Sequence, residues 1–129
     1  MAKKVLMIFL FVLFIVFLGG ILVMIMKPKS PDVGTFDVSE YQSYIESCSS
    51  EENLGNISDS KDLLKKVEAI WIKKYGERIK KQKPYQVFYD KDNDIWLVSG
   101  TLRFHVMGGV AHILVEDDTG KVLAIWHDK

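Results

Sequence analysis

One uninterrupted apolar stretch divides this chain into two parts that must fold in different surroundings. Residues 5–26 (VLMIFLFVLFIVFLGGILVMIM) contain no charged side chain, no amide and no hydroxyl. As a helix this stretch would be about 33 Å long, and the hydrocarbon core of a bilayer is about 30 Å thick. We therefore predict a transmembrane helix over residues 5–26, so that only the rest of the 129-residue chain can build a water-exposed domain.

The alternative for this stretch is a cleaved signal peptide. Its apolar core would be about 7–15 residues long and would end in small residues at a cleavage site. The run here is longer, and Lys-Pro-Lys follows it at residues 27–29. These features favour an uncleaved, single-pass anchor in the cell membrane.

The orientation of the anchor is weakly encoded. Two lysines stand on each side of the apolar stretch, at positions 3 and 4 and at positions 27 and 29, so the positive-inside rule hardly decides between the two orientations. A short N-terminal tail is easily retained in the cytoplasm, and we therefore expect residues 30–129 to lie outside it.

Net charge and cysteine content exclude several classes of protein. Seventeen basic and seventeen acidic residues give a net charge of zero, which argues against nucleic acid as a partner. Cys48 is the only cysteine, so an internal disulfide and a cysteine zinc cage are both excluded. The charges nevertheless lie in blocks, with seven acids and no base in residues 30–60 and nine bases against three acids in residues 61–83. Such blocks are typical of segments with different roles.

The chain is predicted to have three parts. Residues 1–29 form the membrane anchor with its flanking lysines, residues 30–58 form a linker, and residues 59–129 form an α+β domain. Two prolines and one glycine between Lys27 and Thr35 predict an extended, exposed start to the linker.

A short helix is predicted over residues 38–48 of this linker. Its apolar residues recur at steps of three and four, at Val38, Tyr41, Ile45 and Cys48, and Asp37 can cap its start. Cys48 would lie on the apolar face, which favours a buried structural thiol over a reactive one.

The clearest helix is predicted over residues 59–76. It begins at Asp59 or Ser60 as the capping residue, and Gly76 is a natural stop. The apolar residues of one face include Trp71, and the lysines lie mostly off that face as a solvated surface. Beyond Gly76 the period changes to two, and this predicts four strands, at residues 85–90, 95–102, 110–116 and 122–127.

These elements predict an α+β fold in which the transmembrane helix is followed by a helix packed on a curled four-stranded antiparallel meander. The strand at 95–102 offers apolar residues on both faces and should be central. Trp71 and Trp96 should lie in the core. The short helix over residues 38–48 should pack on the same domain, because about 70 residues are close to the lower limit for an independent core.

The sequence contains no recognisable catalytic, cofactor or metal site. Asp90, Asp92 and Asp94 alternate as in a calcium loop, but the sixth position is Ile and the twelfth is Thr, so a solvated turn is expected instead. The histidines, at positions 105, 112 and 127, lack the spacing of a metal motif, and surface or rim positions are expected for them. The pair Gly108-Gly109 is expected to serve a turn or bulge rather than a phosphate cradle. We therefore predict a protein that is not an enzyme and needs no cofactor.

The C-terminal half carries an ordered set of short motifs: Tyr75-Gly76, Lys83-Pro84-Tyr85, DIWLVSGTL at 94–102, GGVA at 108–111, DTGKVL at 118–123 and HDK at 127–129. In order and spacing these motifs resemble the small immunity-protein family with a nuclear-transport-factor-2-like (NTF2-like) fold, which is found in bacterial polymorphic toxin systems. The resemblance covers about residues 60–129. It implies a cystatin-like α+β cone and a non-catalytic protein that binds and neutralises a cognate toxin. It assigns no toxin-contact residue to a position here, so the partner-binding residues stay unknown.

Two other functions remain open at this stage. An envelope inhibitor or accessory module of another kind would have the same sequence features. A small-molecule enzyme on the same cone would need a deep pocket with a perturbed carboxylate.

Overall fold

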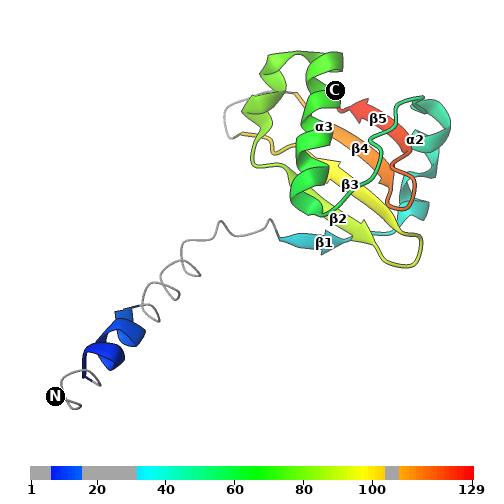
Figure 1. The fold of residues 1–129 in the computed structure, drawn as a ribbon. Helices are drawn as coiled ribbons and strands as arrows, with labels where there is room; N and C mark the ends of the chain where they lie inside the picture. Colours follow the sequence, from blue (N-terminus) through cyan, green and yellow to red (C-terminus); the bar gives the residue numbers. More distant parts are fainter. Residues whose placement is uncertain (1–6, 16–31, 104–107) are drawn as a thin grey trace.

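The computed structural model of the chain describes residues 7–15, 32–103 and 108–129. From residue 32 onward, helices lie on both sides of a five-stranded sheet (Figure 1). The elements follow one another as β1 (Val33–Thr35), the 3-10 helix η1 (Val38–Tyr41), α2 (Gln42–Ser47), α3 (Ser60–Tyr75), the 3-10 helix η2 (Glu77–Gln82), β2 (Gln86–Asp90), β3 (Ile95–Ser99), β4 (Ala111–Glu116) and β5 (Val122–His127).

The sheet has the strand order β1-β2-β3-β4-β5. Strands β2 to β5 form the predicted antiparallel meander, and β3 is the middle strand of the five-stranded sheet. The α+β class is confirmed, but the prediction of four strands is wrong. A fifth strand, β1, pairs in parallel with β2, so the sheet is mixed.

Strand β1 comes from the segment that the sequence assigned to the linker. Val33 lies opposite Val87, and Gly34 lies opposite Phe88. A Cβ atom at position 34 would stand 2.6 Å from Cδ1 of Phe88, so the glycine lets the two backbones approach over this ring. The segment is extended, as predicted, but it is also hydrogen-bonded into the sheet.

Helix α3 covers one face of the sheet. The Asp59 carboxylate accepts a hydrogen bond from the backbone N–H of Asp62 at 2.7 Å, and Gly76 ends the helix with a φ of 87°. Both ends therefore agree with the prediction. Trp71 is completely buried, and its ring meets that of Tyr85 edge to face at 5.1 Å. The core on this side also holds further buried apolar side chains, including those of Leu63, Val67, Val87, Val98, Ile113, Val115 and Val122.

Trp96 is less buried than predicted. Its ring packs partly against the α3-side core, and its indole N–H donates to Asp117 Oδ1 at 2.8 Å. The N–H of a buried indole usually finds a hydrogen-bond partner. The partner lies in the β4–β5 turn, and this holds the side chain at the margin of the core.

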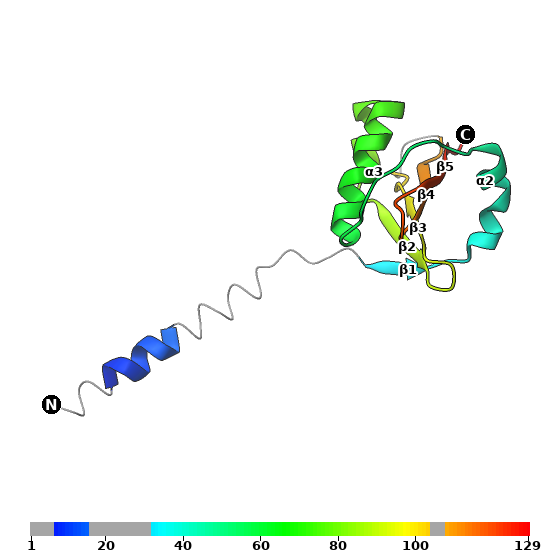
Figure 2. The ribbon, with the colours of Figure 1, turned by 45° about the vertical axis from the view of Figure 1, so that its right-hand side comes forward.

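The opposite face of the sheet is covered by η1 and α2. Tyr41, Ile45 and Cys48 pack against the second core cluster, which contains Leu97, Leu114 and Trp126. Figure 2 shows α3 and α2 on opposite sides of the strands. The predicted short helix is thus confirmed as a 3-10 turn followed by an α-helix. The side chain of Cys48, which was predicted to be buried, is half-buried.

Residues 7–15 form a helix whose side chains are all exposed. None of the helices in the described ranges is both long enough and apolar enough to span a bilayer. Most of the span predicted at residues 5–26 lies outside these ranges, because residues 1–6 and 16–31 are not described. The transmembrane helix therefore stays a prediction.

Candidate functional site

Residues from separate sequence motifs meet at the end of the sheet where β3 and β5 finish and β4 begins. On the α2 side, Ser99 and His112 are opposite each other in the ladder, and the Ser99 hydroxyl is hydrogen-bonded to His112 Nδ1 at 2.7 Å. His112 Nε2 lies 2.8 Å from Asp128 Oδ2. These contacts form a continuous Ser–His–Asp network that runs from β3 through β4 to the residue after β5.

This hydrogen-bonded set of Ser99, His112 and Asp128 has the composition of a catalytic triad but a different geometry. In a serine hydrolase the nucleophile contacts Nε2 and the acid contacts Nδ1, whereas the two nitrogens are exchanged here. An oxyanion would also need free backbone N–H groups nearby. The N–H of Gly100 instead donates to the Ala111 carbonyl at 2.9 Å, and the N–H of Ala111 donates to Gln82 Oε1 at 2.8 Å. The geometry is therefore that of a structural cross-strand clamp.

The clamp also changes the ionisation of its acid. Partial burial opposes ionisation of Asp128, but the hydrogen bond and charge of His112, the Val110 N–H and the charge of His127 together lower its pKa below the ordinary value. Gly109 allows this approach, because a Cβ at that position would collide with Asp128. Gly108 lies in a bend and has a φ of 112°, a backbone conformation that favours glycine.

On the α3 side of the same sheet end, Gln82 connects η2 to the strands. Its side-chain oxygen accepts the hydrogen bond from the Ala111 N–H, and its side-chain nitrogen lies 3.1 Å from Nε2 of His127. Its backbone carbonyl accepts from the N–H of Thr101 at 2.7 Å. A Cβ at position 100 would overlap the Gln82 side chain, so Gly100 makes room for it.

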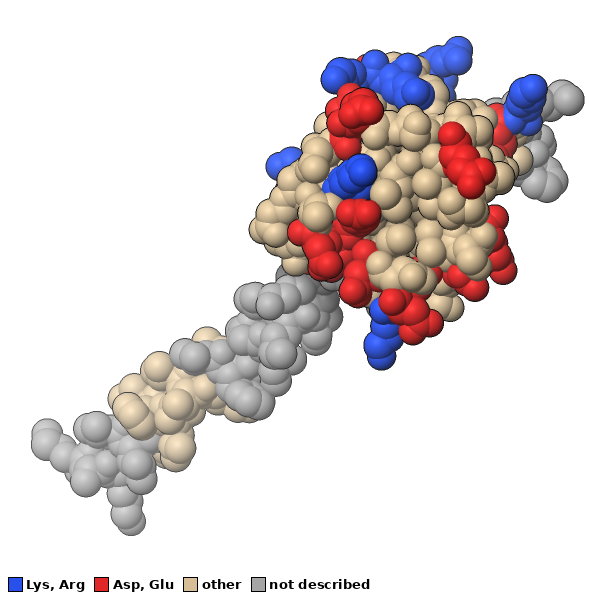
Figure 3. All heavy atoms as spheres, turned by 90° about the vertical axis from the view of Figure 1, so that its right-hand side faces the viewer, with Lys and Arg blue, Asp and Glu red and all other residues tan. Residues whose placement is uncertain are grey.

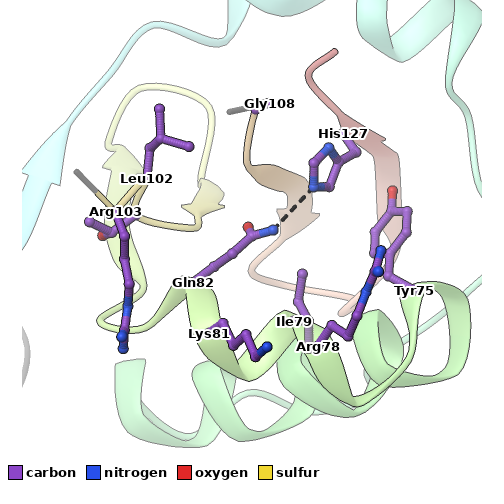
Figure 4. Close-up of a pocket in the computed structure, with 11 residues that line it drawn as sticks. Tyr75, Arg78, Ile79, Lys81, Gln82, Leu102, Arg103, Gly108 and His127 are labelled. Atoms are coloured by element: carbon purple, nitrogen blue, oxygen red, sulfur yellow. Dashed lines mark hydrogen bonds between the residues drawn. The ribbon is translucent and has the colours of Figure 1, made fainter. Parts of the chain in front are cut away.

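A concavity of about 700 Å³ opens beside Gln82 (Figure 4). We call it the basic hollow, and its lining residues are Tyr75, Arg78, Ile79, Lys81, Gln82, Thr101, Leu102, Arg103, Gly108, Gly109 and His127. The lining includes three cationic side chains and no acidic one among the described residues. The ring of Tyr75 meets that of His127 edge to face at 5.5 Å, and burial is the main cause that raises the pKa of the Tyr75 hydroxyl.

A second concavity, of about 600 Å³, lies on the α2 side and contains Ser99 and His112. Its rim carries acids instead, Asp37 and Glu40. Figure 3 shows this side of the molecule, with acidic side chains around a wide uncharged area and basic side chains gathered at the top. The top is the end where α3 finishes and η2 follows (Figure 1), so on this face the basic side chains lie at the η2 end.

In the β2–β3 turn, both carboxylate oxygens of Asp90 accept hydrogen bonds from the protein. Asp90 is only 4% exposed. One of its oxygens accepts from the N–H groups of Asp92 and Asn93, and the other accepts from the Asn93 side chain and the Val38 N–H. The expected solvated turn is correct for Asp92 and Asp94 but wrong for Asp90, whose carboxylate ties the turn to η1. No group of metal-ligating side chains occurs within the described ranges.

The structure places the two described histidines on opposite faces of the sheet. The side chain of His112 is 17% exposed and belongs to the clamp, whereas His127 is exposed at the basic hollow. His105 lies outside the described residues. Sequence reasoning missed Gln82, Arg78 and Lys81 as components of a site, because they belong to a 3-10 helix that has no periodic pattern.

Comparison with protein families identifies the class of protein. A family model described as NTF2 fold immunity protein matches residues 65–129, which is half of the chain and runs from within α3 to the end of β5. The chain therefore belongs to the NTF2-fold immunity protein family, and the resemblance drawn from the motifs is confirmed. Searches of curated proteins and of solved structures gave no match.

Proposed function

We propose that this chain is a membrane-anchored immunity protein that binds and neutralises a cognate bacterial toxin without catalysis. The observation that carries the proposal is the family match over residues 65–129. This region contains most of α3, all of η2 and strands β2 to β5, and with them the clamp and the basic hollow. The clamp geometry supports the non-catalytic part of the proposal, because its ring nitrogens and neighbouring N–H groups are committed to structural bonds.

The apolar stretch at residues 5–26 supports the anchor. Within it, residues 7–15 are helical, and their side chains have exposed fractions between 52% and 73%. An apolar helix with exposed side chains has a higher free energy in water than in lipid, so its transfer into the bilayer is favourable. With a short N-terminal tail in the cytoplasm, the domain would meet a toxin that acts in the envelope or arrives through it.

The proposal predicts that a neighbouring gene encodes the toxin, and its toxin domain is the probe that tests the proposal. The purified full chain, in detergent, is mixed with that domain, and the toxin's activity is measured at increasing ratios. We expect a stable complex and complete loss of toxin activity near equimolar amounts. Retention of full activity at excess chain would overturn the proposal, and a stable complex with an envelope protease instead would favour an inhibitor of another kind.

A further inference from the structure

We propose that the basic hollow receives an acidic segment of the toxin, with one carboxylate held by Arg78 at one end of the hollow and another held by Arg103 at the opposite end. This inference rests on the proposed function, since it names the contact surface for the same partner. The hollow lies within the region matched by the family, whereas the acidic surface of η1 and α2 lies outside it.

The cations of the hollow have no acidic partner among the described residues. The nearby acids are already committed, because Glu77 pairs with Lys80 at 2.8 Å and Glu68 pairs with Lys83 at 2.9 Å. Arg78, Lys81 and Arg103 are exposed and take part in none of the ion pairs of the described residues. Uncompensated charges of one sign around a concavity produce a local potential that attracts the opposite charge.

The chemistry of the lining fits a carboxylate on a short apolar stem. Arginine presents a planar fork that binds a carboxylate through two parallel hydrogen bonds. In Figure 4, Gln82 points toward His127 and forms part of the floor, with Arg78 and Arg103 at opposite ends of the hollow. Ile79 and Leu102 add apolar surface to the lining. Glutamate and aspartate side chains combine a carboxylate with such a stem.

The size of the hollow and the charge difference across the domain favour a protein segment as the occupant. A concavity of about 700 Å³ is large enough for several side chains. On the face shown in Figure 3, acidic side chains surround the α2 side and basic side chains gather at the η2 end, so a toxin with an acidic patch would be steered to the η2 end and turned away from α2.

The test reverses charge at the hollow and at a matched control. Arg78→Glu with Lys81→Glu changes two exposed hollow residues. Lys61→Glu with Lys65→Glu makes the same change in net charge at two exposed positions of α3 that do not line the hollow. Binding of the full-length variants to the neighbouring gene's toxin domain is measured by titration. We expect the hollow pair to weaken binding at least about 30-fold and the control pair by less than about 3-fold.

Salt dependence and hydrogen exchange provide a second measurement that does not depend on these variants. Raising the salt from about 0.05 to 0.5 M should weaken binding of the unchanged chain, and less so that of the hollow variant. Amide exchange in residues 77–82 should slow when the toxin domain is added. Equal affinities for both variant pairs, with unchanged exchange at 77–82, would overturn the hollow as the contact surface while leaving the immunity function intact. Failure of the unchanged chain to bind would instead count against the immunity function itself.

Discussion

At the scale of single residues, Trp71 contributes most to the α3-side core. It is fully buried, and its Nε1 has no hydrogen-bond partner among the residues that the structure describes. We expect Trp71→Ala to lower the free energy of unfolding by about 3–5 kcal/mol, because it leaves a large cavity. Trp71→Phe should cost clearly less, since it also removes an unsatisfied donor. Denaturant unfolding measures the effect of both substitutions, and Trp96→Ala serves as the comparison at a half-buried position. A decrease in the free energy of unfolding of less than about 1 kcal/mol for Trp71→Ala would contradict the packing described.

Asp90 makes the stability of the fold depend on pH, so that the free energy of unfolding decreases on acidification. Hydrogen bonds from the Val38 N–H, then from Asn93 and Asp92, lower its pKa in the folded state. The unfolded chain therefore takes up the proton first, so the stabilisation is present above about pH 4 and is lost as the pH falls through the lower folded value.

The corresponding measurement is the free energy of unfolding between about pH 6 and 2. The unchanged chain should lose stability on acidification more steeply than Asp90→Asn. Asp92→Asn, at the exposed neighbouring position, should follow the unchanged chain. Parallel pH profiles for the unchanged chain and Asp90→Asn would mean that the carboxylate contributes nothing at this turn.

Single-residue environments were predictable from the sequence only where they follow a repeating pattern. Trp71 is in register with the apolar face of its helix, and its burial follows from that. Ser99 and His112 are thirteen residues apart and meet only because of the pairing between β3 and β4. Burial of Asp90 likewise depends on Val38, 52 residues earlier, and no local pattern contains that information.

At the scale of elements, the attachment of β1 depends on Gly34. A Cβ there would stand 2.6 Å from the Phe88 ring. We expect Gly34→Ala to lower the free energy of unfolding by about 1–3 kcal/mol, because the ring or the strand must move. Phe88→Leu should cost less in a chain that already carries Gly34→Ala than in the unchanged chain, since the smaller side chain makes room. Strictly additive effects in this double-mutant cycle would contradict the contact.

Helix α3 and the four antiparallel strands could be predicted because each repeats its pattern over five or more residues and ends at clear signals. Asp59 and Gly76 bound the helix. The turn before β3 is rich in aspartate, and the turn before β5 contains two aspartates and a glycine. Strand β1 has three residues and pairs with a strand some fifty residues later, and η2 has no apolar repeat. The basic hollow depends on η2, so its position could not be inferred from local sequence.

At the scale of the whole molecule, the anchor can be tested by fractionation. We expect the full chain to stay with membranes after carbonate extraction. Phe14→Arg with Ile15→Arg should release it, because two arginines in the helix cost about 5–7 kcal/mol of insertion free energy. Phe14→Leu with Ile15→Leu is the matched control and should remain membrane-bound. Release of the unchanged chain by carbonate would show that residues 5–26 do not span the bilayer.

The central claim is that this member of the NTF2-fold immunity protein family protects its cell from a toxin. The most direct measurement is survival of cells that lack this gene when they meet the toxin encoded beside it. The account predicts that deletion makes these cells sensitive, that the full chain restores growth, and that the toxin's inactivated form harms neither strain. Equal survival of the deletion strain and its parent, at toxin doses that kill an unrelated sensitive strain, would contradict it.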